Sequence, residues 1–236
     1  MEDSSKKQDN FLAASILVAA ILISGSIIYA VGLKPGSQTG SAEKETAGAL
    51  NKPRIGDDVI LGDAKAPLTI FIYSDYQCPF CGKFYQEAER QIRETYIKTG
   101  KVNMVYKDLA FLGQESTAAA EAAECAKDQG KYWDYHDAIF ETEIAELKKS
   151  GNSEHTGNLN RDTFKKIAGD LKMDVDEFLS CYDLKKYASE VNIDLSEAKA
   201  ILPQLSTPTI YIGDEMVQGA YPFTRFSQII DEALKK

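Results

Sequence analysis

Apolar residues are distributed along the chain in two different ways. Residues 11–33 contain no charged side chain over 23 consecutive positions, whereas the rest of the chain mixes apolar and polar residues. At about 1.5 Å per residue, a helix of this length crosses a hydrocarbon core of about 30 Å. We therefore expect a transmembrane signal anchor. A cleaved signal peptide is the alternative, although its apolar region normally spans only about 7–15 residues.

The flanks of the apolar segment indicate how it is oriented. Two lysines precede it and one follows it, so the positive-inside rule favours residues 1–10 as a cytoplasmic tail. Residues 34–56 are rich in Gly, Ser, Ala and Pro, which predicts a flexible linker. The folded domain expected at 57–236 then lies outside the cytoplasm, at the cell surface or in a periplasm, on a single-pass membrane protein.

The folded domain begins with a strand that leads directly into a helix. Leu68 to Tyr73 is a continuous run of β-branched and aromatic residues, as in a strand buried on both faces. After this run, Pro79 suits the first turn of a helix. Apolar residues then recur every four positions along one helix face, at Phe80, Phe84, Ala88, Ile92 and Tyr96.

The remaining pattern predicts a second strand, a long helical block, a hairpin and a last helix. Val102, Met104 and Tyr106 alternate as in a strand. The stretch at about 114–202 is helical in pattern. Its expected helices are 114–127, 131–149, 161–169, 174–182 and 184–202. The hairpin strands after it are expected at 209–212 and 215–218, and the last helix is expected to begin near Pro222.

Composition and charge fit this outline and exclude one class of partner. The 236 residues are 44% hydrophobic and 27% charged, which is typical of a globular protein with one domain besides the apolar segment. The formal net charge is -9, and no Lys/Arg-rich stripe offsets it. A surface this acidic is repelled by phosphate backbones, so we expect no nucleic-acid binding.

The most informative tetrapeptide is Cys78-Pro79-Phe80-Cys81. Two cysteines in the first turn of a helix are close enough to bond, and they lie where unsatisfied N–H groups stabilise a thiolate. The pattern therefore predicts a redox-active dithiol with no further cofactor. Two alternatives stay open: half of a zinc site, which needs a second Cys/His pair, and an inert structural disulfide.

Thr207-Pro208 stands immediately before the predicted hairpin. With this order of elements the sequence resembles the thioredoxin superfamily, in which a cis-proline before such a strand packs beside the cysteine pair. The resemblance implies an α/β thioredoxin-like fold with a large helical insertion, preceded here by the N-terminal transmembrane helix. It also implies catalytic roles for Cys78, Cys81, Thr207 and Pro208.

Several motifs are similar to those of the DsbA/BdbD-like thiol:disulfide oxidoreductases over about 57–236. The resemblance implies disulfide exchange with exported proteins, in which Cys78 is the exposed attacking thiol and Cys81 resolves the mixed disulfide. The motifs are LGDAKAP at 61–67, DYQCPFC at 75–81, QGKYWDYHD at 129–137, TPT at 207–209 and GAYPF at 219–223.

Two positions depart from the family pattern. Strongly oxidising DsbA proteins have a histidine where this chain has Phe80, so one stabiliser of the thiolate is absent. Thioredoxin-like enzymes commonly keep a buried carboxylate six residues before the first cysteine, and here that position is Ile72. Asp75 is the nearest acidic residue. It either relays a proton through water or serves as a polar turn residue that ends the strand, and we favour the second interpretation.

The two other cysteines are expected to pair with each other. Cys125 and Cys181 both lie in the helical block, outside the redox motif. A structural disulfide between them would stabilise the fold by about 4 kcal/mol, because it lowers the entropy of the unfolded chain by closing a loop. The alternative is two separately buried thiols.

These observations favour a monomeric, membrane-anchored dithiol oxidase that exchanges disulfides with exported protein thiols. Its reoxidation requires a membrane redox partner of the DsbB-like or vitamin K epoxide reductase-like kind, which nothing in the sequence identifies. A disulfide reductase or isomerase is the alternative within the same chemistry. A non-redox thioredoxin-like module that binds unfolded segments is the alternative from another class.

Overall fold

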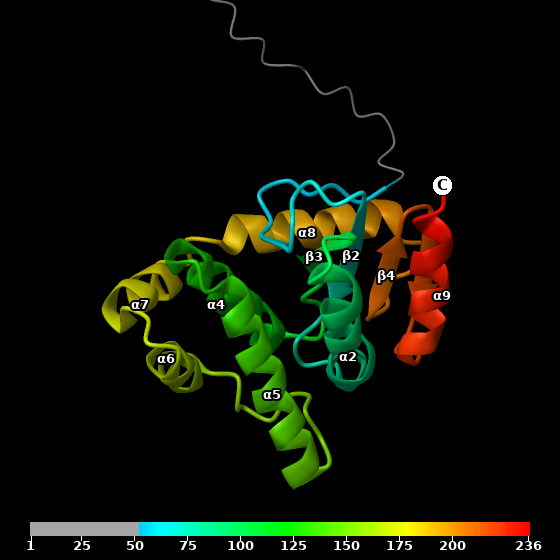
Figure 1. The fold of residues 1–236 in the computed structure, drawn as a ribbon. Coiled ribbons are helices and arrows are strands. Elements are labelled where there is room, and N and C mark those ends of the chain that lie inside the picture. Colours follow the sequence, from blue (N-terminus) through cyan, green and yellow to red (C-terminus); the bar gives the residue numbers. More distant parts are fainter. Residues whose placement is uncertain (1–51) are drawn as a thin grey trace, which may run out of the picture. The chain divides into compact units, whose positions relative to one another are not determined.

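The computed structural model describes residues 52–236, which form a five-stranded mixed sheet with helices on both faces (Figure 1). In spatial order the strands are β1 (Ile60–Leu61), β3 (Val102–Asp108), β2 (Leu68–Ser74), β4 (Thr209–Ile212) and β5 (Glu215–Gln218). β2 therefore lies at the centre of the sheet. It is parallel to β3, and all other neighbouring strands are antiparallel.

Helices cover the two faces of the sheet unequally. On one face lies a continuous helical segment that follows β2. The ring of Phe84 in this segment packs against the ring of Phe226, with 5.1 Å between the two ring centroids. The segment comprises α2 (Pro79–Phe84), the π-helical η1 (Tyr85–Glu89), α3 (Arg90–Ile92) and the π-helical η2 (Arg93–Ile97), and Phe226 belongs to α9 (Phe223–Ala233). The opposite face is covered by α8 (Ala188–Ile201), where Ala198 packs with Tyr73 and Tyr211.

The other helices of the insertion predicted at about 114–202 lie to one side of the sheet (Figure 1), whereas its last helix is α8. They account for most of the chain between β3 and β4. In chain order they are α4 (Gln114–Ala126), the 3-10 turn η3 (Lys127–Gln129), α5 (Tyr132–Ser150), α6 (Arg161–Asp170) and α7 (Val175–Asp183).

Three expectations are corrected in detail. The last insertion helix begins at Ala188 rather than at 184, because Lys185 adopts a left-handed φ of 52° and interrupts the helical path after α7. Strand β1 was not predicted, since two residues carry no periodic pattern. Phe80, expected on the buried face of its helix, is 62% exposed, because the first turn of α2 lies at the end of β2, where no element covers it.

Among residues 52–236, no helix combines the length and apolar character needed to span a membrane. The anchor expected at 11–33 and most of the linker expected at 34–56 lie outside the described residues. Both stay predictions from the sequence.

A buried lysine on β3 connects this strand with α8. Lys107 is 3% exposed, and its ammonium nitrogen lies 2.9 Å from an oxygen of Asp194 and 3.6 Å from one of Glu197, both on α8. Asp58, just before β1, approaches the same nitrogen at 2.5 Å. A buried charge is tolerated only when it is paired in this way. The cluster therefore makes the position of α8 depend on β3.

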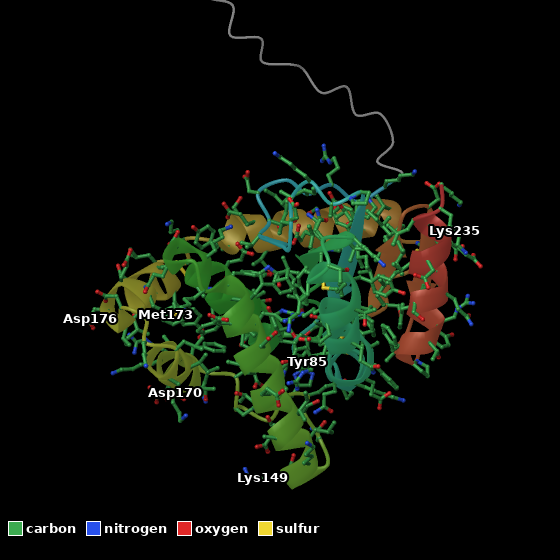
Figure 2. The ribbon with its side chains drawn as sticks, viewed as in Figure 1. Tyr85, Lys149, Asp170, Met173, Asp176 and Lys235 are labelled. Atoms are coloured by element: carbon green, nitrogen blue, oxygen red, sulfur yellow. A yellow bond between two sulfur atoms is a disulfide. The ribbon has the colours of Figure 1, made fainter. Side chains whose placement is uncertain are left out.

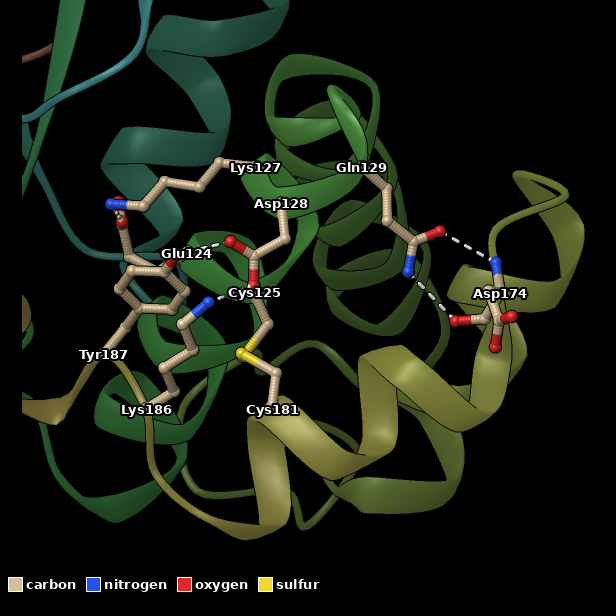
Figure 3. Close-up of a disulfide and its surroundings, with 9 residues drawn as sticks. All are labelled: Glu124, Cys125, Lys127, Asp128, Gln129, Asp174, Cys181, Lys186 and Tyr187. Carbon is tan, nitrogen blue, oxygen red and sulfur yellow. Dashed lines mark hydrogen bonds and ion pairs between the residues drawn. A yellow bond between two sulfur atoms is a disulfide. The ribbon is translucent and has the colours of Figure 1, made fainter.

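The disulfide between Cys125 and Cys181 joins α4 to α7 (Figure 3). These are the two cysteines expected to pair. Polar contacts flank the bond on both sides: Asp128 accepts hydrogen bonds from Lys186 and Tyr187, and Gln129 exchanges two hydrogen bonds with the backbone of Asp174. The disulfide thus lies within a contact zone that holds the insertion helices together.

A second buried network joins the segment after β2 to α5. His136 on α5 is fully buried, with its Nδ1 3.1 Å from the hydroxyl of Tyr76 and its Nε2 3.4 Å from a carboxylate oxygen of Glu89. Arg93 forms an ion pair with the same carboxylate. Tyr85, which is labelled between the two helical segments in Figure 2, stacks on Phe140 of α5 at 5.2 Å. His136 is therefore a packing residue with polar partners.

Replacing the disulfide tests its contribution to stability. In the double variant Cys125→Ala and Cys181→Ala, we expect the free energy of unfolding to fall by about 4 kcal/mol, the loop-closure value for a sequence separation of 56. Thiol exchange at Cys78 should persist, because the bond contributes no atom to that site. Denaturant unfolding and a thiol-exchange assay measure the two effects. An unchanged unfolding free energy would contradict the assigned role.

Glu89 provides a stability test with a defined pH dependence. Although burial opposes it, the charge of Arg93 lowers the pKa of Glu89 to about 2. The ionised carboxylate therefore stabilises the fold above its ordinary pKa of about 4.5, and this contribution is lost as the pH falls toward 2. We expect Glu89→Gln to reduce the free energy of unfolding by about 3 kcal/mol at pH 7 and progressively less below pH 4.5.

The exposed pair of Glu94 and Lys98 on the same segment serves as the control for this measurement. Glu94→Gln should cost less than about 1 kcal/mol at either pH, because solvent screens surface ion pairs. Urea unfolding at pH 7 and pH 3 distinguishes the two variants. Equal losses for Glu89→Gln at both pH values would show that the charge of Glu89 is not the stabilising feature.

Candidate active site

The chain passes from β2 into α2 through Cys78, the residue immediately before the first helical turn. Pro79 occupies the first turn, where its missing N–H costs no helical hydrogen bond. The carbonyl of Cys78 accepts hydrogen bonds from the N–H groups of Cys81 at 2.9 Å and Gly82 at 3.1 Å. These bonds close the turn that carries both cysteines. The Cys78 side chain is thereby held at the N-terminal end of the helix, where a negative charge is favoured.

The environment of Cys78 favours its thiolate. A hydrogen bond from the Cys81 thiol is the largest factor that lowers the pKa of Cys78, to about 6. Burial opposes the shift, whereas the Thr207 side chain and the backbone N–H groups of Phe80 and Cys81 add to it. A cysteine with this pKa is mostly thiolate at pH 7, and the thiolate is the reactive form.

Cys81 has the opposite character. It is 1% exposed, and burial together with the neighbouring Cys78 sulfur raises its pKa well above the ordinary value. The hydroxyl of Ser74 and the backbone of Asp75 offset this only in part. Cys78 itself is only 7% exposed, so the thiol expected to be exposed is largely covered. The pair is therefore a reactive thiolate beside a protected thiol.

Thr207 lies beside Cys78 in space, although it and Pro208 come after the insertion in the chain. The Thr207–Pro208 peptide bond is cis, and the Thr207 carbonyl oxygen lies 3.6 Å from the Cys78 sulfur. Pro208 is fixed in turn, since its carbonyl accepts the N–H of Gly219 at 2.8 Å. Cys78, Cys81 and Thr207, which the sequence analysis named as catalytic, thus come together, although 129 positions separate Cys78 from Thr207.

Asp75 organises the loops around the site. It is 1% exposed, and its carboxylate accepts hydrogen bonds from the N–H groups of Gln77 at 2.9 Å and of Phe111 and Leu112 at 3.1 Å. These contacts agree with the interpretation as a polar residue that ends the strand, and they extend it to the loop after β3. Burial raises the pKa of Asp75, and the Ser116 side chain and the backbone donors oppose that shift. Ile72 is fully buried at the position where a carboxylate is common.

A small pocket beside Cys78 brings in residues that sequence reasoning missed. It has a volume of about 90 Å³ and lies between α2 and α5. Glu143 on α5 and Ser153 in the following loop line it, and both are buried. The Ser153 hydroxyl donates to the Gln77 carbonyl at 3.0 Å, which ties this loop to the start of α2. No local signal marks Glu143, because acidic residues are common along α5.

The other candidate metal ligands do not gather around the dithiol. Cys125 and Cys181 are bonded to each other, and His136 is buried against Tyr76. Within residues 52–236, no group of three or more His, Cys, Asp or Glu side chains is arranged to hold a metal ion. Cys78 and Cys81 are the free cysteines of the described chain.

Comparisons with known proteins agree with this geometry. A family model described as thioredoxin matches residues 55–232. Disulfide bond formation protein D of Bacillus subtilis (strain 168) is 27% identical over 186 residues, which cover 78% of this chain and 80% of that protein. A probable disulfide bond formation protein D of Bacillus anthracis is 23% identical over 235 residues, covering 98% of this chain and all of that protein.

Solved structures show the same fold. The crystal structure of oxidised BdbD from Bacillus subtilis superposes with a TM-score of 0.70 at 25% identity, covering 79% of this chain and 97% of that one. The structure of α-DsbA1 from Wolbachia pipientis superposes with a TM-score of 0.66 at 23% identity, covering 77% and 93%. The sheet and its helical insertion are thus a thioredoxin-like fold, as the resemblance implied.

The asymmetry of the two thiols can be measured directly. In the reduced protein we expect the alkylation rate of Cys78 to rise with pH around a midpoint of about 6, because only the thiolate reacts. Cys81→Ala removes the main hydrogen bond to the Cys78 sulfur and should move this midpoint upward by one unit or more. In Cys78→Ser, Cys81 should stay unreactive up to pH 9. A Cys78 midpoint near 8.5, or faster alkylation at Cys81, would contradict the assigned roles.

Proposed function

Because the chain belongs to the thioredoxin family and is a protein thiol:disulfide oxidoreductase, we propose that its redox centre is the pair Cys78 and Cys81. In this proposal Cys78 forms the mixed disulfide with the substrate, and Cys81 is the thiol that resolves it when the reaction runs toward reduction of the substrate. The observation that carries the proposal is the opposite environment of the two sulfurs, since the pKa of Cys78 is lowered to about 6 and that of Cys81 is raised. Thr207 and Pro208 complete the site beside the Cys78 sulfur.

The direction we propose is oxidation of substrate dithiols. A stabilised Cys78 thiolate favours the reduced form of the enzyme, which makes its disulfide a better oxidant. The oxidised pair accepts a substrate thiolate at Cys78, and a second substrate thiolate then attacks the mixed disulfide and releases the reduced enzyme. No cofactor beyond the dithiol takes part in this cycle.

The substrates we propose are protein thiols that have been exported from the cytoplasm. Two observations support this choice. The relatives are named as disulfide bond formation proteins, and a disulfide such as Cys125–Cys181 persists mainly in oxidising compartments. The apolar segment 11–33 would hold the domain at the outer side of the membrane, where a DsbB-like or vitamin K epoxide reductase-like partner would reoxidise it.

The proposal is tested by oxidation of a reduced, unfolded protein with the purified oxidised chain. We expect stoichiometric transfer of the disulfide and complete loss of transfer in Cys78→Ser. Cys81→Ala has no disulfide of its own, and we expect it to form a trapped mixed disulfide through Cys78 when it is mixed with a substrate protein that carries a disulfide. The reduction potential of the pair should lie between about -270 and -120 mV, the values of thioredoxin and DsbA. Transfer that survives in Cys78→Ser would sink the assignment, and a potential at or below -270 mV would favour the reductase alternative.

A further inference from the structure

The pocket beside Cys78 is lined by both apolar and polar residues. Its position is fixed by close packing of α2 on α5, since a Cβ added to Gly82 would lie only 3.4 Å from Ile144. Pro79, Gly82, Ile144 and Leu147 form its apolar lining, and Lys83, Gln86 and Lys148 also border it. Glu143 and Ser153 supply the buried polar groups. Because Cys78 itself lines this pocket, a substrate joined to its sulfur lies close to it.

Glu143 is buried but only half satisfied. Its side chain is 3% exposed, and one carboxylate oxygen accepts a hydrogen bond from the Asn158 amide. The other oxygen, Oε2, has no hydrogen-bond partner among the described residues. A buried polar atom without a partner costs roughly 1–3 kcal/mol, so its retention beside a reactive sulfur indicates a use other than stability.

Burial, reinforced by neighbouring carboxylates, keeps the proton of Glu143 exchangeable near neutral pH. Burial raises the pKa of Glu143 to about 8, the Asn158 amide opposes the shift, and the charges of Glu115 on α4, Glu146 on α5 and Asp75 add to it. The lysines that border the pocket, Lys83 and Lys148, are exposed. A carboxyl group in this range is well matched to proton exchange with a thiol, whose ordinary pKa is about 8.5.

The attacking substrate thiol must be deprotonated, and the cysteine pair provides no base for this step. Cys78 requires no base, because it is mostly ionised at pH 7. A substrate thiol of ordinary pKa is only about 3% ionised at that pH, and it must lose its proton before it attacks a disulfide. The site therefore gains rate from a base close to the Cys78 sulfur.

We propose that Glu143 is the acid–base residue for the substrate thiol: it accepts the proton of the thiol that attacks Cys78, and it returns a proton to that sulfur when the reaction runs in reverse. The inference rests on the proposed function of Cys78 and adds the group that handles the proton of the substrate. The substrates served are unactivated alkyl thiols, as in cysteine residues of unfolded chains.

In the forward step the substrate thiol transfers its proton to the Glu143 carboxylate, and the resulting thiolate forms a new sulfur–sulfur bond with Cys78. The bond between Cys78 and Cys81 breaks, and its electron pair stays on the Cys81 sulfur, which takes up one proton from solvent. Glu143 then releases the accepted proton to solvent. When a second substrate thiolate attacks the mixed disulfide, Cys78 leaves as a thiolate and the second proton goes to solvent. The substrate loses two electrons and two protons, and the enzyme gains two electrons and one proton.

The decisive experiment compares two classes of thiol with the oxidised full-length chain. Single-turnover reduction rates are measured at pH 7 with an alkyl dithiol peptide and with an aromatic thiol of pKa below 6, which is already ionised. Glu143→Gln should slow the alkyl thiol about 3-fold, since a carboxyl group with a pKa of about 8 is about one-tenth ionised at pH 7 and about 3% of that thiol is ionised without help. The rate with the aromatic thiol should stay unchanged.

Three further measurements separate proton transfer from a structural role. Glu141→Gln, on the same helix and paired with Arg90, is the matched control and should leave both rates unchanged. Glu143→Asp keeps a carboxyl group and should recover part of the alkyl-thiol rate. The alkylation midpoint of Cys78 should move by less than half a unit in Glu143→Gln. The unchanged rate with the aromatic thiol also demonstrates that the variant is folded.

Each outcome decides the question. Loss of rate confined to the alkyl thiol supports the proposal. Equal loss with both thiols, or a large shift in the Cys78 midpoint, overturns it in favour of a structural effect, and unchanged rates in Glu143→Gln overturn it directly. Failure of the parent chain to oxidise either thiol contradicts the proposed function instead, so the two failures are distinguishable.

Discussion

The hydrogen bond between the Cys81 thiol and the Cys78 sulfur is the interaction on which the rest of the site depends. It is the largest factor that lowers the pKa of Cys78. Burial is the largest factor that raises the pKa of Cys81, and the same hydrogen bond adds to it. One bond therefore contributes both to the nucleophile and to the protection of its partner. The bond needs a fixed first turn in α2, and the surrounding structure supplies it. Asp75 anchors the entry to the turn, Thr207 approaches from one side and α5 packs on the other.

The same arrangement explains how the site functions without a histidine between its cysteines. Phe80 occupies that position and is 62% exposed. Because its side chain is a hydrocarbon, it contributes no charge or hydrogen bond to the Cys78 sulfur. Its backbone N–H does contribute, together with the Cys81 and Thr207 side chains. The thiolate is thus stabilised by short-range donors rather than by a neighbouring cation. Such stabilisation is insensitive to salt, because hydrogen bonds made within a buried turn are poorly screened.

Much of this could be predicted from sequence, and the limits have physical causes. The order of strands and helices follows from local periodicity, and the dithiol from a four-residue motif at a helix start. Lys107 shows where such reasoning ends: alternation along β3 predicts one face turned to water, yet all seven residues of the strand are buried. α8 covers the second face, and three carboxylates from distant segments compensate the lysine. No local pattern in β3 predicts that Lys107 forms an ion pair with Asp194, which lies 87 residues later in the chain.

Glu143 was missed for the same reason, and its position suggests why an insertion is useful in this fold. The thioredoxin-like sheet supplies the cysteines, Thr207 and Pro208, but at Ile72 it offers no carboxylate near the dithiol. α5 of the insertion packs along α2 and places a buried carboxyl group beside Cys78. A helix held on one side by the His136 network and on another by Ser153 can keep that group in position. Redox chemistry and proton chemistry are then assigned to different elements, so either can change by mutation without rebuilding the other.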